Sequence, residues 1–148
     1  MRAIALAIGA AFCAGSAMAA EPIASADGEA PGTTLEVREL KLSGGALTLK
    51  FVLKNESDKP FGIYHLMDAS DGGSVDAIYL LDAPGKKKYL AVKDSDGHCV
   101  CSRKIADSLD PNASVALWAK FPAPPDSVQK IGVVVPHFTP MDDVPISR

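Results

Sequence analysis

Residues 46–55 read ALTLKFVLKN, and this stretch decides the fold class because its hydrophobicity changes with every residue. In a β-strand, successive side chains point to opposite faces, whereas an α-helix returns to the same face after three or four residues. The apolar positions that alternate with Thr, Lys and Val are Leu47, Leu49, Phe51 and Leu53. The stretch therefore predicts a β-strand with one face in the core and the other largely in water.

The chain before this strand predicts its hairpin partner. Residues 33–42, TTLEVRELKL, carry apolar side chains and lead into the turn sequence SGG at 43–45. Glycine pairs between two apolar runs are typical of tight hairpin turns. The spacing between Val37 and Leu40 breaks the period of two, which predicts a β-bulge at that point.

Five further apolar runs follow, each bounded by turn residues. They are FGIYHLMD at 61–68, DAIYLLD at 76–82, KKKYLAVKD at 86–94, SVALWAKF at 114–121 and KIGVVV at 130–135. Strands at this spacing, with few helix signals, predict an all-β fold, namely an antiparallel β-sandwich of about seven strands. One stretch, ADSL at 106–109, is consistent with a short turn of helix.

The N-terminal residues predict export. Residues 1–20 contain an arginine, an apolar alanine-rich run and a small-residue pattern, which is the layout of a cleaved signal peptide. Residues 21–32, EPIASADGEAPG, show no apolar periodicity and predict a flexible linker. We expect the mature domain to span residues 33–148 and to be periplasmic or secreted, without a membrane span.

Charge and motifs exclude several classes of function. Removal of Arg2 with the signal leaves 14 of the 15 Lys and Arg against 18 Asp and Glu, a net charge of −4 with histidines neutral. A mildly acidic domain without a basic stripe is a poor match for nucleic acid. The catalytic motifs GxSxG and HExxH are absent, so we expect a protein that is not an enzyme and uses no cofactor.

Residues 94–103, DSDGHCVCSR, form the most chemically suggestive segment. Cys13 leaves with the signal, so Cys99 and Cys101 become an even pair in an oxidising compartment. On a straight strand, residues two apart are too distant for a disulfide, so a bridge requires a bend at Val100. A loop this small stabilises a fold weakly, which favours a loop-shaping or reducible bond.

The same segment also fits a metal site. The thiolates of Cys99 and Cys101 with the imidazole of His98 are soft ligands of the kind that Cu(I) or zinc prefers. At least one further ligand is needed, and the candidates are His65, Met67, His137 and Met141. A redox enzyme is less favoured, because the CxxC motif and βαβ pattern of thiol oxidoreductases are missing. The disulfide and the metal site stay open as alternatives.

Three other features have structural explanations. Trp118, the only tryptophan, lies in a predicted strand, where a large ring more often belongs to the core or a sheet surface than to a ligand platform. The lysines at 86–88 lie at a predicted hairpin tip, where ammonium groups keep a strand edge from pairing with another molecule. The sequon NES at 55–57 fits an exposed turn.

Four segments resemble a family of bacterial domains. They are VDAIYLLD at 75–82, KKYLAVKDSDGHCVCS at 87–102, LDPNASVALWAKFPAPP at 109–125 and VVVPHFTPMDDVPIS at 133–147. Together they are similar to an uncharacterised extracytoplasmic immunoglobulin-like domain of secreted proteins and lipoproteins, sometimes found ahead of OmpA-type domains. The resemblance implies an immunoglobulin-like fold and an envelope location, and it implies no activity.

These observations predict an exported, non-catalytic accessory or interaction domain of the bacterial cell envelope. The expected partner is an unknown envelope protein or a small ligand. Sandwich edges and end loops are ready binding surfaces, and the proline-rich loops FPAPP at 121–125 and PHFTP at 136–140 are the first candidates. The alternative is a periplasmic copper or zinc binding protein that uses the CxC segment.

Overall fold

The alternating residues of the 46–55 segment form one half of the central hairpin. The computed structural model describes residues 20–66 and 73–148. In it, strand β2 (Thr33–Ser43) pairs along its length with strand β3 (Ala46–Asn55) in an antiparallel ladder. The predicted signal peptide lies outside the described residues, apart from its last position.

The turn and the bulge of this hairpin follow from its sequence. Gly44 and Gly45 separate the strands with φ of 60° and 77°, the left-handed conformation that a two-residue hairpin turn requires. The register shifts between Val37 and Glu39, so the predicted bulge is confirmed.

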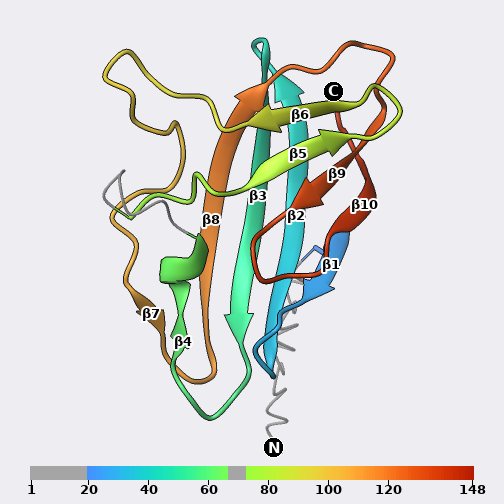
Figure 1. Ribbon diagram of the computed structural model, residues 1–148. Helices are drawn as coiled ribbons and strands as arrows, with labels where there is room; N and C mark the ends of the chain where they lie inside the picture. The colour runs from blue at the N-terminus through green and yellow to red at the C-terminus, as the bar shows by residue number, and fades with distance from the viewer. Residues whose placement is uncertain (1–19, 67–72) are drawn as a thin grey trace, which may run out of the picture.

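Two four-stranded antiparallel sheets face each other as a sandwich (Figure 1). The first sheet, in the order β1-β2-β3-β8, adds β1 (Ala24–Asp27) and β8 (Ala113–Pro122) to the hairpin. The second, in the order β10-β9-β5-β6, consists of β5 (Tyr79–Asp82), β6 (Lys87–Leu90), β9 (Lys130–Val134) and β10 (Met141–Pro145). The antiparallel all-β prediction is therefore confirmed.

A small ribbon and a helical turn complete the described elements. Strand β4 (Phe61–Gly62) pairs with β7 (Ser108–Leu109), and the 3-10 helix η1 (Ile63–Leu66) follows β4. Within the described ranges, no helix is both long enough and apolar enough to cross a membrane.

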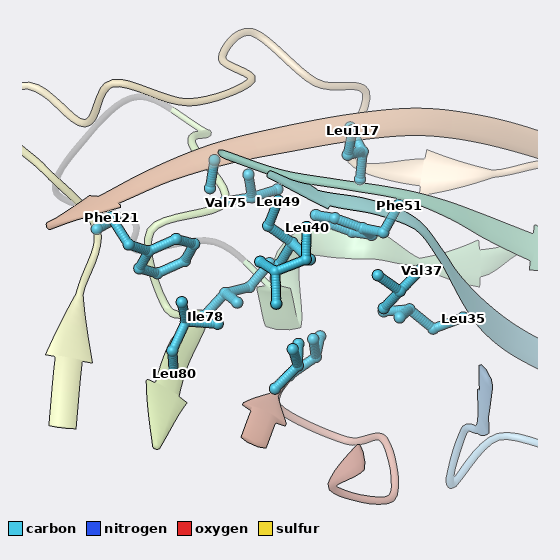
Figure 2. Close-up of a cluster of buried hydrophobic side chains, with 14 of the residues drawn as sticks. Leu35, Val37, Leu40, Leu49, Phe51, Val75, Ile78, Leu80, Leu117 and Phe121 are labelled. Carbon is cyan, nitrogen blue, oxygen red and sulfur yellow. The ribbon is translucent and has the colours of Figure 1, made fainter. Parts of the chain in front are cut away.

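The core lies between the two sheets, and Figure 2 shows side chains from both pointing into it. The long strands β3 and β8 contribute alternate residues, as the period of two predicts. The fully or almost fully buried residues labelled in Figure 2 include Leu35, Val37, Leu40, Leu49, Phe51, Leu117 and Phe121 from the first sheet and Leu80 from the second. The alternation at 46–55 thus separates core from surface, as expected.

The flexible linker predicted for residues 21–32 is wrong in its central part. Residues 24–27 form strand β1, which pairs with β2 from Ala24 opposite Val37 to Asp27 opposite Thr34. Pairing at a sheet edge uses backbone N–H and C=O groups, so it needs no apolar side-chain pattern. This is why periodicity did not reveal the strand.

Three other local predictions need correction. The 61–68 run is a strand for only two residues and then turns into η1. ADSL contributes to strand β7 and not to a helical turn. The described residues hold ten strands where about seven were predicted, because β1, β7 and β10 are short strands that carry no clear alternation.

Segments from the second half of the chain pair with part of each edge of the first sheet. Near one edge, the Leu42 N–H donates to the Ser147 carbonyl (2.8 Å) and the Ser147 N–H donates to the Leu40 carbonyl (2.9 Å). At the other edge, the loop that follows β6 lies along β8 (Figure 1). Where an edge is paired in this way, it offers no unpaired backbone groups to other molecules.

Tyr89 is a buried residue whose hydroxyl has no hydrogen-bond partner within the described residues. Burial first, and the Asp82 carboxylate second, raise the pKa of this phenol above its ordinary value of 10.0. Because a desolvated hydroxyl without a partner costs free energy, we expect Tyr89→Phe to raise the free energy of unfolding by about 1 kcal/mol at pH 7.

The pH dependence of this variant provides its check. Below the unfolded-state pKa of the phenol both states are protonated, and above it the unfolded state ionises first, so the wild type loses stability. Urea unfolding should therefore show that the advantage of Tyr89→Phe grows as the pH rises above about 10. A variant that is less stable than the wild type at pH 7 would mean that the hydroxyl is satisfied.

Candidate functional site

The cysteine segment folds as a bent, closed loop. A disulfide joins Cys99 to Cys101, whose Cα atoms are 5.3 Å apart, and both residues are buried. Val100 lies at a bend, as the sequence required for a bridge. The preceding turn is fixed by the Asp94 carboxylate, whose Oδ1 accepts the N–H groups of Asp96 (3.0 Å) and His98 (2.9 Å).

This loop pairs with the outer edge of β8. The Lys120 N–H donates to the Val100 carbonyl at 3.0 Å, and the Lys120 carbonyl accepts the Val92 N–H at 2.8 Å. Two residues earlier, Trp118 exchanges bonds with Ser102: its carbonyl accepts the Ser102 N–H at 2.8 Å, and its N–H donates to Ser102 Oγ at 2.9 Å. The disulfide therefore closes a small loop that is hydrogen-bonded along the strand that carries Trp118, and this loop acts as a clip on the edge of β8.

The structure does not bring the predicted metal ligands together. His137 lies beside β1, where its Nδ1 is 2.8 Å from Glu29 Oε2. Cys101 pairs with Ala119 on β8, at the other edge of the first sheet. Three strand spacings of about 4.8 Å separate these edges, far more than two ligands of one ion allow.

The remaining candidates are Met141, His65 and Met67. Met141 is buried in β10, and the side chain of His65 and all of Met67 lie outside the described residues. In the described part of the chain, no group of three His, Cys, Asp or Glu side chains is placed to hold a metal ion. His137 therefore lies too far from the cysteines to bind the same ion in this structure, and metal binding by the reduced His98–Cys101 segment stays a prediction.

A shallow apolar groove lies beside Trp118 on the first sheet. It has a volume of about 270 Å³ and lies on the face of the sheet that points away from the core. Its floor comes from Val52 and Ala116, which lie opposite each other in the β3–β8 register. Its walls are Trp118, Lys50 and Arg38.

The side chain of Trp118 points away from the core and is partly exposed to water. It lies between the inward Leu117 and Ala119 on β8, so alternation places it on the outer face, where it is 38% exposed. Trp118 therefore lies on the sheet surface, which is one of the two positions that the sequence predicted for it. The alternation along β8 already predicts which of its side chains point outward. That Ala116 lies opposite Val52, and forms the floor of the groove with it, follows only from the pairing register of β3 and β8.

The charges around the groove are mainly positive. Every charged residue of β3 and β8 is a lysine, namely Lys50, Lys54 and Lys120. Lys50 lies opposite Trp118, and its Nζ contacts Glu39 at 3.1 Å while 55% of its side chain stays exposed. No ion pair of Lys120 is present among the described residues.

Arg38 forms a fixed wall of the groove. Its guanidinium donates to the Glu36 carboxylate and to the Ala20 carbonyl, so its position is set by two partners. Glu36 also accepts from Lys54 Nζ at 2.7 Å. The cations with exposed ammonium groups beside Trp118 are therefore Lys50 and Lys120.

No protein-family model, curated protein or solved structure matches this chain. Its function is therefore inferred from the geometry of its own residues. That geometry offers a preformed apolar floor, an exposed indole and two solvated ammonium groups on one rigid sheet. Concave apolar sites with a few charged groups are typical of binding sites, so this groove is the candidate site.

Proposed function

We propose that this protein is an exported, non-catalytic interaction domain of the bacterial cell envelope that binds its partner or ligand at the Trp118 groove. The signal-like N-terminus and the resemblance to extracytoplasmic immunoglobulin-like domains support the location. The same resemblance supports an immunoglobulin-like assignment of the sandwich, since both are built from two packed antiparallel sheets.

One observation carries the choice of site. The only tryptophan of the chain is exposed on a sheet face, next to a groove whose floor has no polar side chain. Tryptophan is enriched among residues that dominate binding energy, because it buries a large area at a small entropy cost. The strand under it is fixed by pairing on both sides, with β3 and with the cysteine loop.

Oxidative labelling read by mass spectrometry tests the proposed site. Wild-type protein is labelled alone and with an envelope extract of the native host, and the modification of Trp118 is compared with that of Leu90. Leu90 is a suitable reference because it is 61% exposed and lies on the second sheet. We expect the extract to lower labelling of Trp118 at least about twofold and to leave Leu90 unchanged.

Two results would contradict the proposal. Protection of Leu90 without protection of Trp118 would move the binding surface to the second sheet. If the extract changed the labelling of neither Trp118 nor Leu90, neither face would be bound by envelope components.

A further inference from the structure

We infer that the Trp118 groove binds a single-chain anionic amphiphile, that is, an alkyl chain that ends in a carboxylate or phosphate. This inference rests on the proposed function, because it names the ligand class of the same groove. Three properties of the groove carry it: an apolar floor, a floor strand β3 whose backbone groups are paired on both sides, and an ammonium group, that of Lys50, at the rim.

The floor of the groove selects an alkyl chain. Val52 and Ala116 present only hydrocarbon to a ligand, and the Trp118 ring forms an adjacent wall. Burial of apolar surface is favourable in proportion to area and requires no directional contacts. A flexible hydrocarbon chain can follow such a floor between the two neighbouring strands.

The backbone under the floor argues against a peptide. β3 is an interior strand, paired with β2 on one side and β8 on the other, so its N–H and C=O groups are already used. An extended peptide laid across this face would find no backbone partner there, and unpaired peptide groups are costly when they are removed from water. An alkyl chain carries no such groups.

The rim of the groove selects a negative headgroup. Lys50 lines the groove directly across from Trp118, and Lys120 lies outside the groove, two residues beyond Trp118 on the same outer face. An ammonium has three donors, so the Lys50 contact with Glu39 leaves donors for a ligand. A headgroup at this position stays at the water surface while its chain lies on the floor.

The same lysines disfavour a second copy of the chain as occupant. Around the groove this face carries Arg38, Lys50, Lys54 and Lys120 against Glu36 and Glu39, so two copies that met through it would each bring a net positive charge. Like charges placed opposite each other destabilise an interface. This face is therefore better suited to an acidic ligand than to a second copy of the chain.

Trp118 supplies a direct readout, since it is the only indole in the chain. Its fluorescence is titrated with octanoate, octyl phosphate, octanol and acetate, each kept below the concentration at which it aggregates. We expect a blue shift with octanoate and octyl phosphate, affinity about fivefold weaker for octanol because it lacks the charge, and no response to acetate.

Three variants locate the response. Ala116→Asp places a carboxylate on the floor, and Lys50→Glu reverses the rim charge, and each should weaken octanoate binding at least about tenfold. Leu90→Ala is the matched control, since it removes a more exposed apolar side chain beside lysines of the other sheet. It should leave the affinity unchanged, and far-ultraviolet circular dichroism should show the same fold for all three.

The outcomes separate the ligand class from the proposed function. Equal affinity for octanol and octanoate, or full affinity in Ala116→Asp, would overturn the inference. A response to phosphatidylglycerol vesicles without one to octanoate or octyl phosphate would overturn it in favour of a membrane surface. If octanoate and octyl phosphate give no fluorescence response while envelope extract still protects Trp118 from oxidation, the ligand class is wrong and the proposed binding site stands. If the extract also gives no protection of Trp118, both the ligand class and the proposed binding site are wrong.

Discussion

Replacement of Phe51 by alanine is expected to lower the free energy of unfolding by about 3–5 kcal/mol. Phe51 is 1% exposed in the middle of β3, between Val37 on β2 and Leu117 on β8. Its ring fills the space between the sheets (Figure 2). Removal of the ring loses its transfer free energy and leaves a cavity that a tightly packed core closes only in part. Equilibrium urea denaturation measures the loss.

The next residue on the strand is the matched control. Val52 points to the outer face and is only partly buried, so Val52→Ala should cost about 1 kcal/mol or less. The contrast between neighbours tests the alternation that underlies the fold. Equal losses for Phe51→Ala and Val52→Ala would mean that the two faces of β3 are not core and surface.

Asn55→Ala is expected to lower the free energy of unfolding by about 2–4 kcal/mol. Asn55 is fully buried at the end of β3, and its Nδ2 donates to the carbonyls of Lys59 (2.7 Å), Leu109 (3.0 Å) and Asp110 (3.1 Å). Its Oδ1 accepts the N–H (3.1 Å) and Oγ (2.6 Å) of Ser57. Alanine would leave several of these groups buried without partners. Thermal or urea unfolding measures the effect.

A second asparagine gives the comparison for this prediction. Asn112 is exposed in the turn before β8, where its φ is 56°. Asn112→Ala loses only the preference of asparagine for the left-handed region, which costs about 1 kcal/mol. If Asn55→Ala proved no more costly than Asn112→Ala, the buried amide network would not stabilise the fold as described.

The fold class was predictable because alternation is a local property. The β2–β3 hairpin, its glycine turn and its bulge all followed from residues within one stretch of chain. Strands β1, β7 and β10 did not, because their pairing depends on backbone groups of distant segments. Asn55 shows the same limit: its sequon suggested an exposed turn, whereas contacts with residues more than fifty positions away bury it.

The candidate site was predictable only in its parts. The bend at Val100 and the surface position of Trp118 follow from local geometry. Their relation to each other does not, since the cysteine loop meets β8 through four long-range backbone and hydroxyl bonds. The segment that looked most reactive in the sequence thus lies beside the groove as a support for its strand.

Amide hydrogen exchange at β8 measures most directly whether the cysteine loop is a structural clip for the binding face. The N–H groups of Trp118 and Lys120 point to the loop, whereas antiparallel alternation points those of Leu117 and Ala119 toward β3. In a double variant, Cys99→Ala with Cys101→Ala, we expect the first pair to exchange at least about tenfold faster and the second pair to keep its rates.

The pattern along the strand decides the result. Faster exchange confined to Trp118 and Lys120 would show that the disulfide holds the loop against the strand that carries the groove. Unchanged exchange at both amides, or equal acceleration of all four, would contradict a local clip.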